Sequence, residues 1–137
     1  MSSSDFPNRL YHGTTPEGFK GILTTGIVPG EGESCVYLAS SEEQAAKYVH
    51  HHHAWRQLDG DVVYSYLGEP EPAAEPTRGF VYVIEIDTSH LDHALFERHD
   101  IKDSYYLNLP IYTYEGTVPM EAIRTFRKYP IQTIQKP

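Results

Sequence analysis

Apolar residues gather in short segments along the chain, and several segments alternate with polar residues as β-strands buried on one face do. Residues 80–87 carry apolar side chains at nearly every position, which predicts a strand at the centre of a sheet. Shorter strands are expected at residues 9–13, 35–39, 62–67, 111–114 and 131–135, the last of them at an edge.

Two helices are expected between the first strands, because the sequence carries their start and stop signals. Thr15 can cap the first helix and Gly26 suits its end. The second helix begins at Ser41 with a capping box, since Gln44 follows three residues later. A third, short helix is expected after Pro119, and its apolar face would hold Ala122, Ile123 and Phe126.

These elements indicate an α+β fold for residues 1–137 as a single domain. Residues 68–78 contain three prolines, so they are expected to form an acidic surface excursion and not a regular element. A length of 137 residues allows one domain with a core and is too short for two ordinary ones.

Charge and cysteine content exclude several classes of function. The net charge of −8 argues against a general nucleic-acid binder. Cys35 is the one cysteine, which excludes an intramolecular disulfide and a thiolate zinc site. The absence of a signal peptide and of a long apolar run predicts a soluble, cytoplasmic protein without membrane contact.

Four consecutive histidines, His50–His53, invite a metal-binding interpretation. On a helix they point in all directions, so at most two of them could share one metal ion. We therefore predict no metal site and interpret the run as a solvated helix end.

A candidate ligand site lies in the N-terminal half. His12 and Gly13 close the first strand at the turn into the capped helix, where a histidine ring can face a ligand and a glycine lets it approach the main chain. Tyr37 lies in the next strand, and Tyr48 follows on a helix eleven residues later. Two aromatic rings and this histidine could hold a planar ring that carries an amide.

The motif Leu10-Tyr11-His12-Gly13-Thr14, followed by Tyr37 and Tyr48, resembles the ADP-ribosyltransferase superfamily, in the branch with a His-Tyr-acid signature that includes the poly(ADP-ribose) polymerases. The step between the two tyrosines is the same in that branch. The resemblance implies two small β-sheets with two early helices around a cleft for NAD, which is the co-substrate.

The resemblance also implies a role for each matching residue. His12 would bind the nicotinamide ribose, the main chain of Gly13 the nicotinamide amide, and Tyr37 and Tyr48 the two faces of the ring. Thr14 and Ser40 are further candidate contacts to NAD, and Arg9 is a candidate donor to its pyrophosphate. Ala45 departs from the pattern, because that branch has a serine there.

The chain is also similar to the small rifamycin-inactivating ADP-ribosyltransferases in length and in the order of its C-terminal segments. The matching segments are Gly79 to Glu85, Asp87 to Asp92, Ser104-Tyr105, Ile111 to Tyr114 and Glu115-Gly116. Only the N-terminal motif is specific, so we do not assign the substrate of that group to this chain.

The catalytic carboxylate is left open by the sequence. The superfamily glutamate stands eight residues before the proline of an Ile-Pro-x-x-x-Ile tail, and the matching position is Ile111, as in some mono-transferases with an aliphatic residue there. Asp92 is the favoured candidate, by comparison with the rifamycin group. Glu115, Glu121 and no carboxylate at all are the alternatives.

The sequence therefore predicts a mono-ADP-ribosyltransferase with His12, Tyr37 and Asp92 as catalytic residues. The acceptor, which could be a protein, a nucleic acid or a small molecule, and the oligomeric state stay open. Two alternatives are an NAD-dependent RNA 2′-phosphotransferase and a non-catalytic module that binds NAD or ADP-ribose.

Overall fold

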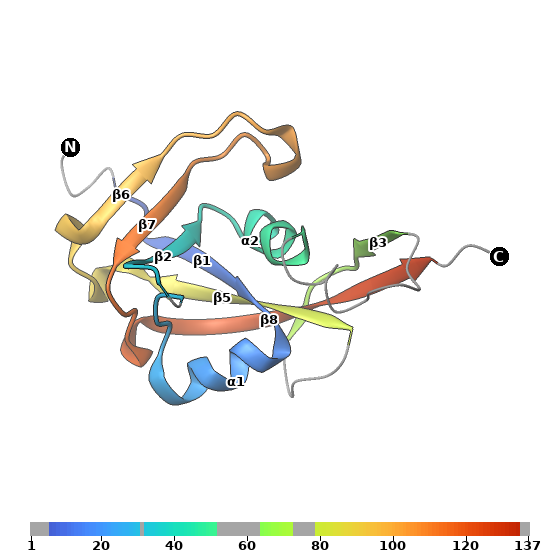
Figure 1. Ribbon diagram of the computed structural model, residues 1–137, viewed down its shortest axis with the longest axis horizontal. Helices are drawn as coiled ribbons and strands as arrows, with labels where there is room; N and C mark the ends of the chain where they lie inside the picture. The colour runs from blue at the N-terminus through green and yellow to red at the C-terminus, as the bar shows by residue number, and fades with distance from the viewer. Residues whose placement is uncertain (1–5, 31, 52–63, 73–78, 135–137) are drawn as a thin grey trace.

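The computed structural model describes residues 6–30, 32–51, 64–72 and 79–134. Within these ranges the chain forms an antiparallel sheet and two α-helices, which confirms the α+β class (Figure 1). The strands are β1 (Arg9–Thr14), β2 (Cys35–Ala39), β3 (Tyr64–Leu67), β4 (Glu71–Pro72), β5 (Phe80–Asp87), β6 (Phe96–His99), β7 (Ile111–Glu115) and β8 (Ile123–Ile134).

The described strands form one sheet, and the two small sheets implied by the resemblance are not observed. Their spatial order is β3-β8-β5-β1-β2-β7-β6, with β4 added beside β8. The sheet stays continuous because β1 and β2 keep an antiparallel contact, with Tyr11 opposite Ala39. Each of these two strands pairs over a longer stretch with its other neighbour. β1 pairs with β5 from Arg9 to Thr14, and β2 pairs with β7 from Cys35 to Ala39.

The helices α1 (Pro16–Thr25) and α2 (Glu42–Val49) begin where the sequence predicts. The side chain of Thr15 accepts a hydrogen bond from the N–H of Gly18 at the start of α1, and Gly26 ends that helix at a φ of 80°. The side chain of Ser41 caps α2 by accepting the N–H of Gln44. Both boundaries thus depend on local hydrogen bonds that the sequence specifies directly.

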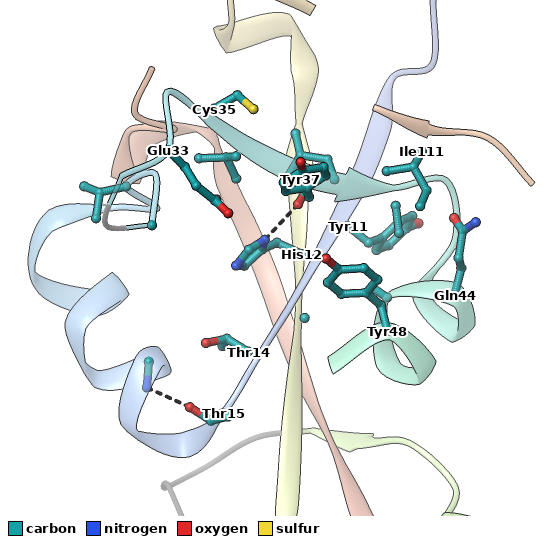
Figure 2. Close-up of a pocket in the computed structure, with 18 residues that line it drawn as sticks. Tyr11, His12, Thr14, Thr15, Glu33, Cys35, Tyr37, Gln44, Tyr48 and Ile111 are labelled. Atoms are coloured by element: carbon teal, nitrogen blue, oxygen red, sulfur yellow. Dashed lines mark hydrogen bonds between the residues drawn. The ribbon is translucent and has the colours of Figure 1, made fainter. Parts of the chain in front are cut away.

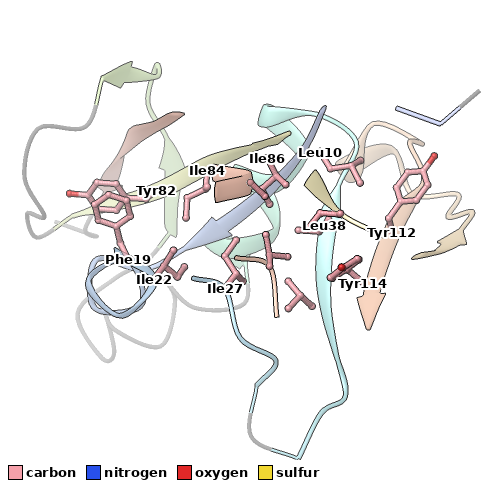
Figure 3. Close-up of a cluster of buried hydrophobic side chains, with 14 of the residues drawn as sticks. Leu10, Phe19, Ile22, Ile27, Leu38, Tyr82, Ile84, Ile86, Tyr112 and Tyr114 are labelled. Atoms are coloured by element: carbon pink, nitrogen blue, oxygen red, sulfur yellow. The ribbon is translucent and has the colours of Figure 1, made fainter. Parts of the chain in front are cut away.

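The two helices cover opposite faces of the sheet, and β5 is buried between them. Its side chains alternate: Tyr82 and Ile84 belong to the same core cluster as residues of α1, whereas Val81 and Val83 pack with residues of α2. Figure 3 shows the first of these cores, in which the ring of Phe19 stacks on that of Tyr82 with centroids 4.4 Å apart. Burial on both faces explains the continuous apolar run of this strand.

The expected helix after Pro119 is wrong. Met120–Ala122 form a single 3-10 turn (η6), and Ile123 already begins the long strand β8. The strand continues to Ile134 because it finds hydrogen-bonding partners on both sides, β5 along its first part and β3 at its end. The segment 131–134 is consequently the end of β8, where it pairs with β3, and not a separate strand.

The sequence also missed two short strands. Glu71–Pro72, within the segment 68–78 where no regular element was expected, pair with β8 as β4, and residues 73–78 lie outside the described ranges. The strand β6 pairs with β7 and forms one edge of the sheet. Three more 3-10 turns lie on either side of β6 in the chain. These are η3 (Thr88–His90) and η4 (His93–Leu95) between β5 and β6, and η5 (Ser104–Tyr106) between β6 and β7. Among the described residues, no helix has the length and apolar character needed to cross a membrane.

Candidate functional site

The strands β1 and β2 separate on one side of the Tyr11–Ala39 contact and leave a cavity between them (Figure 2). On that side β1 stays paired with β5 as far as Thr14, and β2 stays paired with β7 back to its first residue, Cys35. The cavity has a volume of about 530 Å³. Small-molecule sites span roughly 300–1,000 Å³, so the cavity can hold part of a nucleotide-sized ligand.

His12 connects the two strands that border the cavity. Its Nδ1 lies 3.0 Å from the main-chain oxygen of Tyr37 (Figure 2). A carbonyl oxygen can only accept, so Nδ1 is the donor and carries the proton. In the neutral ring Nε2 then holds the lone pair, which makes it an acceptor for a hydroxyl group. The hydrogen bond therefore orients the ring and limits the separation of β1 and β2.

Tyr37 and Tyr48 supply aromatic rings to the same cavity, from β2 and α2 respectively. The Tyr37 side chain is 43% exposed, and Tyr48 is half-buried. Burial raises the pKa of Tyr48 above its usual value, and the neighbouring Tyr37 and Glu33 raise it further. The phenol of Tyr48 consequently stays protonated at neutral pH and can donate a hydrogen bond. Two such rings beside one cavity suit a flat, ring-shaped ligand.

Gly13 allows α2 to lie close against β1. A Cβ atom at this position would overlap the main-chain oxygen of Ala45 and stand 2.8 Å from Cγ1 of Val49. The sequence suggested that this glycine admits a ligand to the main chain. The structure shows that helix packing requires it as well, because any larger residue would push α2 away.

Thr14 lines the cavity, whereas Ser40, the other further contact that the sequence suggested, does not. The hydroxyl of Ser40 donates to the main-chain oxygen of Pro110, and its N–H donates to the side chain of Gln44. Ser40 thus holds the start of α2 against the segment that leads into β7, a structural role.

Gln44 is completely buried and connects α2 to two other segments. Its Oε1 accepts the N–H of Ser40 at 2.8 Å, and its Nε2 donates to the main-chain oxygens of Tyr106 at 3.2 Å and Leu109 at 2.9 Å. The ring of Tyr106 lies 6.2 Å from that of Tyr48, measured between centroids. Gln44 therefore fixes the segment that stands behind one wall of the cavity.

Replacing Gln44 by leucine should lower the free energy of unfolding by roughly 2–4 kcal/mol, because three main-chain groups lose their buried partner. Urea denaturation measures this change. The matched control is Glu43→Leu, since Glu43 is the exposed neighbour on the same helix and should change stability by about 0.5 kcal/mol or less. Equal effects of the two substitutions would contradict the role of Gln44.

The three carboxylates that the sequence suggested do not line the cavity. Asp92 accepts the N–H of Ala94 and caps η4. Glu115 is exposed at the end of β7 opposite Cys35, and Glu121 is exposed in η6. Their positions give none of them a contact with a ligand in this cavity.

Glu33, which the sequence analysis missed, is the one carboxylate among the described residues that line the cavity. It precedes β2 in a loop without periodicity, so only its nearness in sequence to Tyr37 could have indicated it. Ile111 also lines the cavity, at the position that the count from Pro119 identified.

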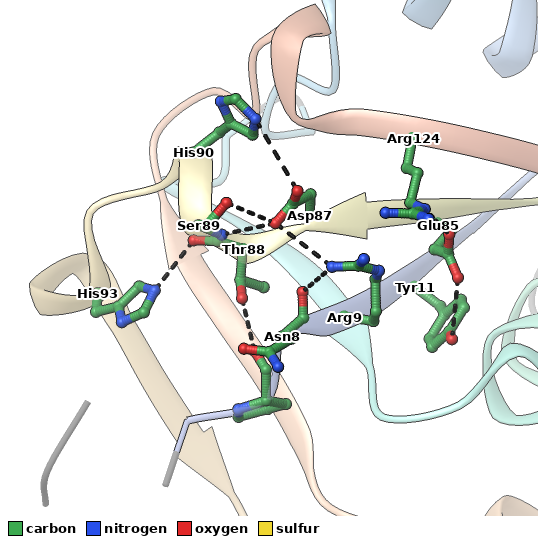
Figure 4. Close-up of polar contacts among 11 residues, drawn as sticks. Asn8, Arg9, Tyr11, Glu85, Asp87, Thr88, Ser89, His90, His93 and Arg124 are labelled. Atoms are coloured by element: carbon green, nitrogen blue, oxygen red, sulfur yellow. Dashed lines mark hydrogen bonds and ion pairs between the residues drawn. The ribbon is translucent and has the colours of Figure 1, made fainter. Parts of the chain in front are cut away.

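No lysine or arginine is among the described residues that line the cavity. Arg9 belongs to a different cluster, in which its guanidinium donates to the main-chain oxygen of Asn8 at 3.0 Å and lies 3.5 Å from the carboxylate of Asp87 (Figure 4). Without a basic side chain and with one carboxylate, the described lining favours a neutral or cationic group over a phosphate.

Comparison with known proteins adds no family assignment: no family model and no curated protein sequence matches the chain. Within the described ranges, no three histidine, cysteine, aspartate or glutamate side chains are grouped so that they could hold a metal ion. The histidine run is not solvated throughout, because His50 is buried whereas His51 is exposed. His52 and His53 lie outside those ranges. The functional interpretation therefore rests on the cavity between β1 and β2.

Proposed function

We propose that the chain is a mono-ADP-ribosyltransferase that takes NAD+ as co-substrate, cleaves its nicotinamide–ribose bond and transfers ADP-ribose to an acceptor. The observation that carries the proposal is the 3.0 Å contact from Nδ1 of His12 to the main chain of Tyr37, beside a cavity that Tyr48 also lines. The residues that the resemblance assigns to nicotinamide riboside thus meet at one cavity.

In the proposed complex, the nicotinamide ring lies against Tyr37 and Tyr48, and its amide pairs with the main chain of β1 near Gly13. Nε2 of His12 accepts a hydrogen bond from a ribose hydroxyl. Because the tyrosines hold the nicotinamide ring and His12 holds the ribose, the orientation of the bond between ring and sugar is fixed for cleavage. The pyrophosphate and adenosine extend outward from the cavity.

The charge of the lining supports the oxidised dinucleotide. The nicotinamide of NAD+ is a cation and that of NADH is neutral. Aromatic faces attract a cation by about 0.5–2 kcal/mol, and the carboxylate of Glu33 adds to this attraction. We therefore expect the protein to distinguish the two forms by their charge.

Titration calorimetry should show that NAD+ binds roughly 2–30-fold more tightly than NADH, since an attraction of that size corresponds to such a ratio. The substitution Tyr37→Leu should reduce this preference. Tyr105→Leu is the matched control, because Tyr105 is 41% exposed, close to the 43% of Tyr37, and lies outside the cavity. Equal affinity for NAD+ and NADH would contradict the proposed position of the nicotinamide ring against Tyr37 and Tyr48.

The test of the proposed function is nicotinamide release. The protein is incubated with NAD+, and free nicotinamide is followed by chromatography against a sample without protein. Release above the spontaneous rate is the expected result. Saturable binding of NAD+ without release would instead support a non-catalytic binding module, and removal of a 2′-phosphate from RNA would support the phosphotransferase.

A further inference from the structure

We propose that Glu33 is the catalytic carboxylate of this site, in place of the carboxylates that the sequence suggested. The inference rests on the proposed function, because it assigns a residue to that reaction. Glu33 lines the same cavity as His12 and Tyr48. Ile111, which the count from Pro119 matches to the acid of the resembled superfamily, also lines it and carries no carboxylate. Figure 2 shows the carboxylate of Glu33 pointing into the cavity toward the ring of His12.

A turn before β2 holds Glu33 at the cavity. Its N–H donates to the main-chain oxygen of Gly30 at 2.9 Å, which closes the turn. Gly30 also leaves room for the carboxylate, because a Cβ atom there would lie 3.3 Å from Oε2 of Glu33. The contacts within the loop therefore direct this side chain, and among the described residues no ion pair of Glu33 is found.

The charge of Glu33 acts across the cavity. Glu33, in the loop before β2, and Tyr48, on α2, both line the cavity. Burial is the largest cause of the raised pKa of Tyr48, and the charges of Tyr37 and Glu33 add to it. A ligand bound between His12 and Tyr48 would consequently be within the field of this carboxylate.

The chemistry of the transfer needs a group with this charge. As the bond between C1′ of the ribose and the nicotinamide nitrogen breaks, its electron pair goes to that nitrogen, and positive charge develops on the sugar. The negative carboxylate stabilises this charge. The acceptor then forms a bond to C1′ with its own lone pair, and its proton passes to the carboxylate of Glu33.

The test compares three single substitutions for nicotinamide release and NAD+ affinity. Glu33→Gln keeps the size of the side chain and removes its charge and basicity, so the rate should fall about 100- to 1,000-fold. NAD+ affinity should change less than tenfold, and the melting temperature should stay the same because the side chain is exposed. Glu97→Gln, an exposed carboxylate on β6 outside the cavity, should retain the full rate, as should Asp92→Asn.

Three results would overturn the inference in distinguishable ways. Glu33→Gln with a rate within threefold of the unaltered protein would reject Glu33 and leave the proposed function intact. A rate lost in Asp92→Asn and kept in Glu33→Gln would return the role to the residue that the sequence favoured. Absence of release by the unaltered protein would reject both the proposed function and the inference.

Discussion

Replacing His12 by alanine should reduce nicotinamide release from NAD+ by about a hundredfold or more. The substitution removes the acceptor for the ribose hydroxyl, and small errors in the position of a reacting group cost rate on this scale. It also removes the hydrogen bond to Tyr37 that spans the separated strands. Release measured under saturating NAD+ reports the first effect, and thermal denaturation reports the second.

Two further substitutions separate these effects. His12→Asn keeps an amide N–H near the position of Nδ1, so it should restore stability without restoring the rate. His99→Ala is the matched control, because His99 contacts the hydroxyl of Thr113 on β7 and lies outside the cavity. It should change the rate less than twofold. A His12→Ala protein as active as this control would exclude the proposed role of the imidazole.

Replacing Gly13 by alanine should destabilise the fold by roughly 1–3 kcal/mol, the range typical of enlarging a tightly packed position. The new Cβ atom would overlap the main-chain oxygen of Ala45, which cannot rotate away as a side chain can, and would crowd Val49. Helix α2 would therefore have to shift, and Tyr48 would move with it. Urea denaturation measures the loss of stability.

Gly21 provides the control for this substitution. It lies inside α1, and a Cβ atom there would meet no atom within 4 Å. Gly21→Ala should stabilise the protein by about 0.5–1 kcal/mol, because alanine favours the helix over glycine. If both alanine variants unfold at the same urea concentration, the close approach of α2 to β1 is not a constraint on the sequence.

The elements that the sequence predicted correctly depend on nearby residues. Thr15 and Gly26 set the ends of α1, and Ser41 with Gln44 starts α2, since capping is a hydrogen bond between neighbours. The central position of residues 80–87 in the sheet could also be predicted from the sequence, because a strand buried on both faces has few polar side chains. Such signals need no knowledge of the rest of the fold.

The features that the sequence missed depend on contacts between distant residues. The apolar spacing after Pro119 fits a helix, but β5 pairs with residues 123–130 and the segment becomes the first part of β8. Tertiary pairing can override such a local preference. In the same way, Asp92 and Glu33 are both loop carboxylates, and only the path of the chain decides which of them meets the cavity.

The central claim is that the cavity between β1 and β2 holds the nicotinamide riboside end of NAD+. A crystal structure with a carbocyclic analogue of NAD+, which cannot be cleaved, tests this claim most directly. We predict the nicotinamide ring between Tyr37 and Tyr48, with a ribose hydroxyl within hydrogen-bond distance of Nε2 of His12. An analogue bound with its nicotinamide end elsewhere, such as the second cavity beside Tyr129, would contradict the claim.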